Sequence, residues 1–312
     1  MTEQIQVLMT QPLLQSCVDG LEERFRVHRL YEQKDRTAFL QAHGENIRAL
    51  AGHAADAKLM DALPNLEIIA NFGVGYDNID TDAAKARNIR VTNTPDVLND
   101  AMGEITIGLM ISLARKIPQA ERYLRAGKWA KEGVFGLQSE LNGKTVGIVG
   151  LGSVGKEIAT RCQAMKMRVV YHGRNRQRNV PYVYYDNLKE MARDVDWLVV
   201  IVPGGEGTKN LVDRDVLMAL GPNGMLVNVA RGSVVDEPVL IEMLQQNRIG
   251  GAALDVFADE PNVPEALIEL DNVVLSPHQG SATHQTRYEM GALVVANLEA
   301  HFAGNPLLTP VV

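Results

Sequence analysis

The stretch that decides the fold is Gly143-Lys-Thr-Val-Gly-Ile-Val-Gly150-Leu-Gly152-Ser-Val-Gly155-Lys-Glu-Ile-Ala159. Residues 145–149 form a short apolar run of the kind found in buried parallel strands. This run leads directly into Gly150-x-Gly152-x-x-Gly155, and from Lys156 onward apolar residues recur at helical spacing. A strand, a glycine turn and a helix in this order predict a dinucleotide-binding unit.

Each glycine of the motif has its own expected role. Gly150 allows a tight turn, Gly152 lets the backbone approach a pyrophosphate, and Gly155 lets the helix pack closely on the strand. The free N–H groups at the start of the helix would then bind the phosphates. A tight turn without a ligand is the alternative, and the correct flanking strand and helix favour the nucleotide site.

Length and composition narrow the class of protein. A chain of 312 residues is long enough for two domains, and 46% hydrophobic with 22% charged residues is ordinary for a globular protein. A net charge of −7 without a basic block argues against nucleic acid or a membrane surface as a partner. Small acidic substrates remain possible, because one local arginine can attract them.

The two cysteines and the N-terminus bear on location. Cys17 and Cys162 form no metal-binding or disulfide pattern, which suits a reducing compartment and predicts no metal site. Residues 1–6 do not resemble a signal peptide, and no apolar run reaches transmembrane length. We therefore expect a soluble cytoplasmic protein.

Strands and helices alternate along the chain, which predicts an α/β protein with two doubly wound parallel sheets. The expected strands are residues 5–9, 25–28, 47–50, 66–70, 90–94, 145–149, 167–171, 197–202, 225–229, 252–254 and 273–275. The main expected helices are residues 11–18, 81–86, 96–114, 238–246 and 281–303, and residues 116–141 are expected to be irregular.

The position of the glycine motif sets the expected domain order. It lies in the second set of strands, so we expect a Rossmann-type nucleotide domain at residues 98–284. That domain would be inserted into a flavodoxin-like substrate domain formed by residues 1–97 and 285–312.

The loop after the next strand predicts which nucleotide binds. NAD-specific folds place an Asp or Glu about 20 residues past the glycines, where it binds the ribose 2′-OH. Gly173 occupies that place here, with Arg174 beside it. A guanidinium pairs with a 2′-phosphate, whereas a carboxylate would repel it. The loop therefore predicts NADP(H) in preference to NAD(H), and a solvated basic loop is the alternative.

Polar residues follow each of the last three expected strands, at the edge where open α/β sheets bind ligands. They are Arg231, then Asp255 and Glu260, and finally His278. Hydride reduction of a carbonyl needs an acid for the oxygen and a cation to orient the substrate. A neighbouring carboxylate favours the protonated form of histidine. Arg231, Glu260 and His278 have the required chemistry, although each alone could be an ordinary surface or turn residue.

These motifs resemble those of the D-2-hydroxyacid dehydrogenase family, in order and spacing, over essentially the whole chain. The likeness rests on Gly-Leu-Gly-Ser-Val-Gly (150–155), Asn-Val-Ala-Arg-Gly-Ser-Val-Val-Asp-Glu (228–237), Asp-Val-Phe-Ala-Asp-Glu-Pro (255–261) and Pro-His-Gln-Gly-Ser-Ala-Thr (277–283). Within the family, Tyr-His-Gly-Arg (171–174) and His-x-Gly-Ser-Ala-Thr (278–283) are similar to the NADP-preferring glyoxylate/hydroxypyruvate reductase branch.

The resemblance implies a role for each catalytic candidate. Arg231 would bind the substrate carboxylate and keto oxygen, His278 would be the acid/base, and Glu260 would be its partner. The backbone of the first domain would hold the carboxylate as well. The implied substrate-binding residues are Val74, Gly75, Arg231 and Ser281.

The resemblance also implies a homodimer and a set of cofactor contacts, in which Asp255 would meet the nicotinamide amide. The implied cofactor-binding residues are Gly150, Leu151, Gly152, Ser153, Val154, Gly155, Gly173, Arg174, Val202, Pro203, Val229, Ala230, Asp255, His278 and Gly280. Two features depart from the family pattern: Met102 in the long helix, and the glycine-rich loop of residues 203–208. Cofactor contacts at both places are therefore open.

The implied reaction is the NADPH-dependent reduction of glyoxylate or hydroxypyruvate to a D-2-hydroxy acid. One alternative is a reductase of larger keto acids, such as 2-ketogluconate or hydroxyphenylpyruvate, which pocket size would decide. A second alternative is a non-catalytic nucleotide-sensing protein, similar to the corepressor members of this fold. Such a protein would need no complete set of Arg, Glu and His.

Overall fold

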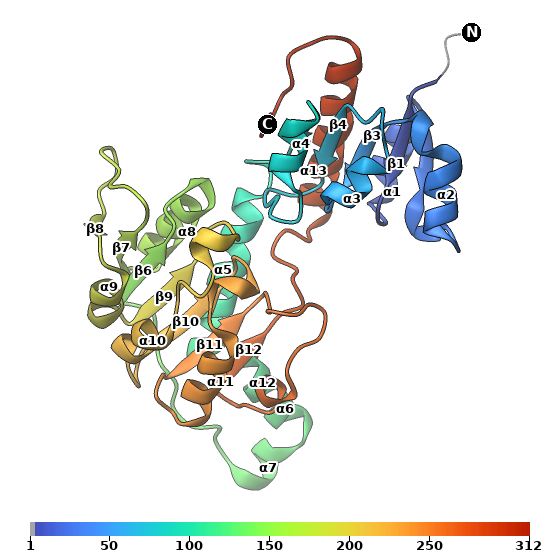
Figure 1. Cartoon of the computed structure of the whole chain (residues 1–312). Coiled ribbons are helices and arrows are strands. Elements are labelled where there is room, and N and C mark those ends of the chain that lie inside the picture. The colour runs from blue at the N-terminus through green and yellow to red at the C-terminus, as the bar shows by residue number, and fades with distance from the viewer. Residues whose placement is uncertain (1–3) are drawn as a thin grey trace. The chain divides into compact units, whose positions relative to one another are not determined.

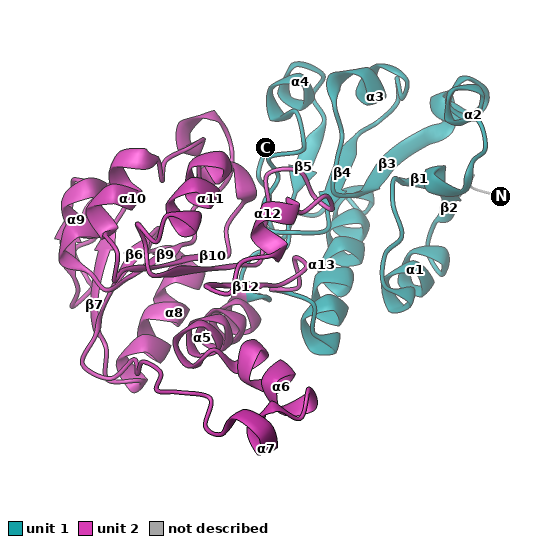
Figure 2. Ribbon diagram, turned by 90° about the horizontal axis from the view of Figure 1, so that it is seen from below, with its two compact units in different colours: residues 1–98, 281–312 teal, residues 99–280 magenta. Residues whose placement is uncertain are grey.

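The computed structural model describes residues 4–312, so the expectation for residues 1–6 lies partly outside the described residues. The chain divides into two compact units (Figure 2). Unit 1 is Met1–Leu98 with Ser281–Val312, and unit 2 is Asn99–Gly280. Residues 281–284 therefore belong to unit 1, whereas we expected the second boundary after residue 284.

Unit 1 contains a parallel five-stranded sheet in the order β2-β1-β3-β4-β5, the flavodoxin-like arrangement that was expected. Its strands are β1 (Gln6–Met9), β2 (Arg26–Arg29), β3 (Ile47–Gly52), β4 (Ile68–Asn71) and β5 (Arg90–Thr92). Helices α2 (Arg36–His43), α3 (Ala57–Asp61) and α4 (Thr81–Ala86) cover one face, and α1 (Gln15–Glu22) and α13 (His284–Phe302) cover the other (Figure 2). Two single turns, η1 (Leu30–Glu32) and η2 (Gly44–Asn46), complete it.

The sequence of unit 1 explains these elements. Every residue of β1 and β4 is buried, because helices cover both faces of a parallel sheet. Three of the helices start after an aspartate whose carboxylate accepts a backbone N–H of the first turn: Asp35, Asp56 and Asp80. We expected the first helix at residues 11–18, but residue 14 is still extended. Gln11 instead accepts a hydrogen bond from the His53 backbone N–H at 3.2 Å.

Unit 2 contains a parallel seven-stranded sheet in the order β12-β11-β10-β9-β6-β7-β8, which extends the Rossmann order by one strand. Its strands are β6 (Thr145–Val149), β7 (Arg168–His172), β8 (Val183–Tyr185), β9 (Trp197–Val200), β10 (Met225–Asn228), β11 (Gly251–Leu254) and β12 (Val273–Leu275). Its helices are α5 (Asn99–Arg115), α6 (Ile117–Arg125), α7 (Lys128–Glu132), α8 (Ser153–Ala164), α9 (Leu188–Asp194), α10 (Arg214–Leu220), α11 (Glu237–Gln245) and α12 (Glu265–Ile268), with single turns η3 (Glu206–Thr208) and η4 (Gly232–Val234). Helices α5 and α8 lie on one face, and α9, α10 and α11 on the other (Figure 2).

Several sequence expectations for unit 2 were wrong. Residues 116–141 include α6 and α7 (Figure 1), where we expected an irregular segment. Pairs of opposite charge four residues apart stabilise both helices, between Glu121 and Arg125 and between Lys128 and Glu132. The short edge strand β8 was not foreseen, because none of its three residues is buried and no apolar run marks it.

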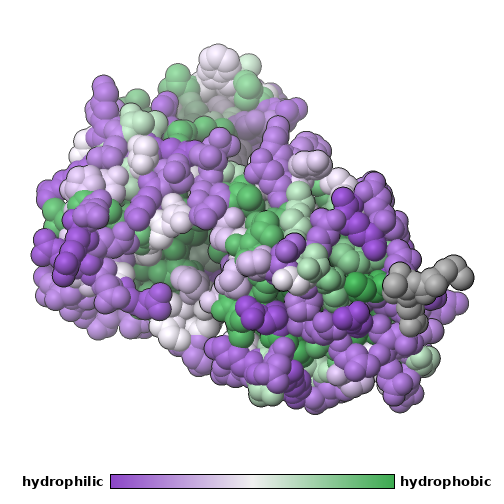
Figure 3. Space-filling view, turned by 90° about the horizontal axis from the view of Figure 1, so that it is seen from above, coloured by the Kyte–Doolittle hydropathy of each residue, from purple (hydrophilic) through white to green (hydrophobic). Residues whose placement is uncertain are grey.

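Two kinds of feature, a membrane-spanning helix and a metal-binding cluster, are absent from the described residues. No helix within residues 4–312 has the length and apolar character needed to span a membrane. In the same part of the chain, no three His, Cys, Asp or Glu side chains gather as metal ligands. The face of the molecule drawn in Figure 3 is mostly hydrophilic.

The glycine turn between β6 and α8 has the geometry expected of a nucleotide-binding loop. Gly150 has a φ of 102°, and a Cβ there would lie 2.4 Å from the Ile201 carbonyl oxygen. A Cβ on Gly155 would lie 2.1 Å from the Gly150 carbonyl oxygen, whereas one on Gly152 would meet no atom within 4 Å. Gly150 and Gly155 are thus required by the fold, and Gly152 leaves space for a ligand. Helix α8 already begins at Ser153, three residues earlier than expected.

Gly155→Ala should lower the free energy of unfolding by about 1–3 kcal/mol, because the new methyl group overlaps a backbone oxygen. Helix propensity alone predicts the opposite sign, since alanine is favoured over glycine in a helix by about 1 kcal/mol. Chemical denaturation followed by circular dichroism measures the change. Gly173→Ala is the control, because its Cβ would meet nothing within 4 Å. A stabilised Gly155→Ala variant would show that this contact does not constrain the turn.

Candidate active site

The sheet order of unit 2 brings the expected catalytic residues to one edge. Strands β10, β11 and β12 are direct neighbours and all run parallel. Arg231 follows β10, Glu260 follows β11 and His278 follows β12, so all three lie beyond the carboxyl ends of adjacent strands. The glycine turn after β6 lies at the same edge of this sheet. This is the edge at which open α/β sheets bind their ligands.

His278 and Glu260 form a hydrogen-bonded pair. The distance from His278 Nδ1 to Glu260 Oε2 is 2.6 Å, and the two side chains are 48% and 33% exposed. The other carboxylate oxygen of Glu260 accepts the Phe257 backbone N–H at 3.0 Å. Glu260 is therefore held at both oxygens, and it leaves the Nε2 atom of His278 to face a reactant.

Asp255 fixes the loop that carries His278. Its carboxylate is 1% exposed and accepts hydrogen bonds from the Ser276 hydroxyl at 2.6 Å and from the backbone N–H groups of Gln279 and Gly280, each at 2.9 Å. The His278 N–H donates to the Asp255 carbonyl oxygen at 2.9 Å. These contacts hold His278 in a left-handed conformation with a φ of 49°. The implied contact of Asp255 with the nicotinamide stays a prediction.

Arg231 is half-buried and anchored at its backbone. The Asn228 side-chain amide donates to the Arg231 carbonyl oxygen at 2.9 Å and accepts the Ala230 N–H at 3.1 Å. The Arg231 Nη1 atom donates to the Ala230 carbonyl oxygen at 2.8 Å. A Cβ on Gly232 would lie 2.0 Å from the Phe257 carbonyl oxygen, so the loops after β10 and β11 meet at backbone distance. The arginine thus extends from a rigid corner.

The basic loop after β7 is also held in place. The Tyr184 hydroxyl donates to the Gly173 carbonyl oxygen at 3.1 Å, and the Gln177 side chain donates to the Leu151 carbonyl oxygen at 2.6 Å. The second bond joins the basic loop to the glycine turn. Arg174 is exposed, and a Cβ on Gly173 would meet nothing within 4 Å. The loop therefore offers open space at Gly173 and the exposed guanidinium of Arg174, at the position where we expect the ribose.

The remaining expected cofactor residues differ in which of their groups, backbone or side chain, a ligand could contact. Leu151, Val229 and Ala230 are at most 4% exposed, so only their backbone can meet a ligand. Ser153 and Val154 start α8, where backbone N–H groups have no partner inside the helix. A Cβ on Gly280 would lie 2.6 Å from the Met102 sulfur, so Met102 packs directly against the end of the His278 loop. Val202 and Pro203 follow β9.

Unit 1 contains the other expected substrate residues. Val74 and Gly75 follow β4, again at the carboxyl edge of a parallel sheet, and both are half-buried. Ser281 is half-buried and precedes α13, so it belongs to unit 1 although the neighbouring His278 belongs to unit 2.

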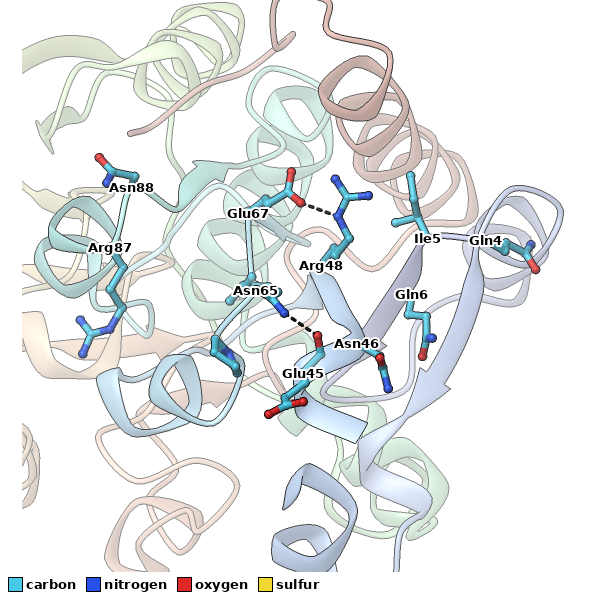
Figure 4. Close-up of a pocket in the computed structure, with 12 residues that line it drawn as sticks. Gln4, Ile5, Gln6, Glu45, Asn46, Arg48, Asn65, Glu67, Arg87 and Asn88 are labelled. Atoms are coloured by element: carbon cyan, nitrogen blue, oxygen red, sulfur yellow. Dashed lines mark hydrogen bonds and ion pairs between the residues drawn. The ribbon is translucent and has the colours of Figure 1, made fainter. Parts of the chain in front are cut away.

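A cavity of about 460 Å³ in unit 1 lies at the opposite edge of the sheet, where the strands begin (Figure 4). The arginines there already have partners, because Arg48 pairs with Glu67 and Arg87 pairs with Asp61. The Asn65 amide donates to the Glu45 carbonyl oxygen at 2.7 Å (Figure 4). The cavity lies at the edge opposite to the one where parallel sheets bind their ligands, so we do not assign the reaction to it.

Two buried asparagines were missed by the sequence analysis as site-building residues. Asn71 and Asn228 are each 1% exposed and form the last residues of β4 and β10. Each asparagine directly follows a run of apolar strand residues, and this pattern could have indicated its role. A buried amide must find hydrogen-bond partners, and at the end of a strand these lie in nearby loops. Asn228 lay within a motif that we quoted, but its two backbone contacts depend on the turn geometry.

Comparison with known proteins identifies the family. Residues 107–280, which lie in unit 2, match the model described as D-isomer specific 2-hydroxyacid dehydrogenase, NAD binding domain. The chain is 48% identical to a glyoxylate/hydroxypyruvate reductase A of Arabidopsis thaliana, covering 99% of this chain and 100% of the relative. It is 46% identical to a hydroxyphenylpyruvate reductase of Plectranthus scutellarioides, with 99% and 100% covered.

A solved structure gives the same result. The NADPH-dependent glyoxylate/hydroxypyruvate reductase of Sinorhizobium meliloti, in complex with NADP and malonate, is 45% identical with a TM-score of 0.95. The match covers 99% of this chain and 97% of that one. These findings confirm the two-sheet fold and the resemblance seen in the sequence, and they identify unit 2 as the dinucleotide-binding unit. The chain belongs to the D-isomer specific 2-hydroxyacid dehydrogenase family.

Proposed function

We propose that the chain reduces small 2-keto acids, chiefly glyoxylate and hydroxypyruvate, to D-2-hydroxy acids with NADPH. The observation that carries the proposal is the 2.6 Å pair of His278 and Glu260, at the same sheet edge as Arg231 and the glycine turn. The relatives from Arabidopsis thaliana and Sinorhizobium meliloti are named for this activity. A non-catalytic nucleotide-binding protein would have no use for this acid/base pair.

The residues divide the chemistry between them. The Arg231 guanidinium would bind the substrate carboxylate and polarise the keto oxygen. His278 would donate a proton from Nε2 to that oxygen, because its Nδ1 is engaged by Glu260. Glu260 would hold the imidazole in its orientation through this hydrogen bond. When bound, the nicotinamide supplies the hydride that reduces the keto carbon.

The proposed cofactor is NADP(H) in preference to NAD(H). The open space over Gly152 and the first N–H groups of α8 fit a pyrophosphate. Arg174 fits a 2′-phosphate, and the loop of residues 173–178 contains no carboxylate that would repel one. The bound NADP of the similar Sinorhizobium meliloti structure agrees with this assignment.

We also propose a homodimer that acts in the cytoplasm. Large apolar side chains are exposed along α6, α7 and the loop after them, which favours contact with a second copy. They are Ile117, Leu124, Trp129, Val134 and Leu137. The buried, unpaired thiols of Cys17 and Cys162 suit a reducing compartment. Sedimentation velocity tests the dimer, and a monomer at micromolar concentration would contradict it.

A reductase of larger keto acids is the second candidate. The hydroxyphenylpyruvate reductase of Plectranthus scutellarioides is nearly as similar to this chain as the Arabidopsis enzyme, at 46% against 48% identity. Steady-state kinetics of the wild type with hydroxyphenylpyruvate and 2-ketogluconate, beside glyoxylate and hydroxypyruvate, distinguish the two candidates. A higher kcat/KM for either larger acid would favour this candidate.

Arg231→Ala should reduce kcat/KM for glyoxylate by about 100-fold, because the substrate anion loses a charged hydrogen-bond partner worth about 2–5 kcal/mol. Loss of NADPH absorbance measures the rate. Arg214→Ala is the matched control, since Arg214 forms an exposed ion pair with Glu242 on the helices of the same unit. Equal kinetics of the wild type and Arg231→Ala would remove Arg231 from substrate binding.

Glu260→Gln should reduce kcat for glyoxylate by about 10-fold or more, because His278 loses a hydrogen bond to a charged group, which contributes about 1.5–3 kcal/mol. Loss of NADPH absorbance measures the rate. Glu242→Gln removes the charge of an exposed ion pair in the same unit and should keep the wild-type kinetics. An unchanged kcat in Glu260→Gln would show that this carboxylate does not orient the imidazole for the reaction.

Arg174→Ala should raise KM for NADPH by about 10-fold or more, the usual effect of losing one hydrogen bond to a charged group, and leave KM for NADH unchanged. Arg193→Ala, an exposed arginine on α9, is the control and should change neither constant. Equal effects on both cofactors, or a wild type that prefers NADH, would contradict the assignment of the 2′-phosphate site.

A further inference from the structure

We infer that Asn71 and Asn93 are positioning residues that shape the carboxylate-binding loop of unit 1, by fixing the direction of its peptide groups. The loop is Gly73-Val74-Gly75, directly after β4. This inference rests on the proposed function, because it concerns the loop that would receive the carboxylate of the 2-keto acid.

Asn71 holds the loop at both ends. Its side chain is buried at the end of β4, with 1% exposure. The Nδ2 atom donates to the carbonyl oxygens of Gly73 at 2.8 Å and Gly75 at 3.0 Å. The opposite amide orientation would place Oδ1 against these two oxygens, so the hydrogen-bond pattern itself settles the orientation.

Asn93 holds the middle of the loop. It follows β5, the strand next to β4, and its Nδ2 atom donates to the Val74 carbonyl oxygen at 2.9 Å. The next residue, Thr94, donates its backbone N–H to the Gly73 carbonyl oxygen at 3.0 Å. Three successive carbonyl groups are thus held by groups at the end of the sheet.

Fixed carbonyl groups imply fixed N–H groups. In a planar trans peptide the C=O of one residue and the N–H of the next point in opposite directions. The bonds to the Gly73 and Val74 carbonyls therefore set the directions of the Val74 and Gly75 N–H groups. Within residues 4–312, neither of these two N–H groups has an acceptor in the chain. They point away from the asparagines and are available to an anion.

Burying the Asn71 side chain carries a free-energy cost, so a residue chosen only to pack the strand would not be an asparagine. Its Oδ1 atom is buried without a hydrogen-bond partner in the described residues. A buried acceptor without a hydrogen bond lowers the stability of the folded state. The three preceding residues of β4 are apolar. An apolar residue would avoid this cost at the last position of the strand. The amide at this position is explained by the two hydrogen bonds that its Nδ2 atom donates to the loop.

The C-terminal segment supports Asn93 in turn. The Thr309 hydroxyl donates to the Asn93 carbonyl oxygen at 2.6 Å, and the Asn93 N–H donates to the Thr309 carbonyl oxygen at 3.3 Å. Asn297 of α13 is fully buried and donates to the Thr309 hydroxyl at 2.9 Å. The loop is therefore fixed by a network that extends to the last residues of the chain, all within unit 1.

The test uses Asn71→Leu and Asn93→Leu, which remove the amide donors at similar volume without adding a charge. Both variants should raise KM for glyoxylate by about 10-fold or more and change kcat little, because binding of the carboxylate is weakened in the ground state and the transition state alike. The Kd for NADPH should stay unchanged, since unit 2 would bind the cofactor. Affinity for oxamate, a 2-keto acid analogue, should fall by the same factor in calorimetry with NADP⁺ present.

Asn65→Leu is the matched control, because Asn65 also donates an amide hydrogen to a backbone carbonyl of unit 1, but at the opposite sheet edge (Figure 4). It should leave KM and oxamate affinity unchanged. If Asn71→Leu does not fold, the half-buried Asn93 decides the result. Unchanged KM and oxamate affinity in a folded variant would overturn the inference. If the wild type binds oxamate but reduces no 2-keto acid, the proposed function is wrong. The oxamate affinities of the wild type and the two asparagine variants then still test whether the asparagines shape the loop.

Discussion

The buried carboxylate of Asp255 is the constraint on which the geometry of the candidate active site depends. A charge removed from water must be compensated by hydrogen bonds, and Asp255 receives them from Ser276, Gln279 and Gly280. All three partners belong to the loop that carries His278. The loop therefore closes tightly over the end of β11, and His278 is held in a left-handed conformation that few side chains adopt. Its imidazole then meets Glu260, which leaves the same strand.

The same physical device appears in both units. A parallel strand is buried on both faces, so a polar side chain at its carboxyl end must bond to the loop that follows. Asn71 does so at the end of β4 and Asn228 at the end of β10. Asp255, directly after β11, bonds instead to the loop that follows the neighbouring strand β12. Each of these buried groups converts a flexible connection into a fixed one. Loops that carry chemistry can then be rigid although they lie outside the sheet.

Much of this arrangement could be predicted from the sequence, because the strong signals are local. The apolar run before Gly150 and the glycines themselves predicted the βα turn, and the structure gives each glycine the expected surroundings. Apolar runs also predicted most strands, since both sheets are parallel and buried. Arg231, Glu260 and His278 could be placed at one sheet edge because parallel strands have their carboxyl ends together. That their three strands are neighbours depends on the sheet order, which the sequence did not show.

Helices α6 and α7 were missed although their ion pairs are local, because we did not weigh charges four residues apart. The remaining features depend on contacts between distant residues. Gln11, where we expected the first helix to start, accepts a hydrogen bond from the His53 N–H. The bonds from Asn93 to Val74 and from Thr309 to Asn93 link residues far apart in the chain. The spacing of apolar residues in the sequence does not indicate such contacts. Sequence patterns thus found the chemical groups, and the structure was needed to find what holds them.

If the proposed function is correct, a 2-keto acid bound at this sheet edge receives a hydride and a proton with a defined stereochemistry. The most direct measurement is to incubate the protein with NADPH and hydroxypyruvate, follow the NADPH absorbance, and determine the configuration of the product by chiral chromatography. We expect loss of absorbance with equimolar formation of D-glycerate. Formation of L-glycerate, or no consumption of NADPH with any of the four keto acids, would contradict it.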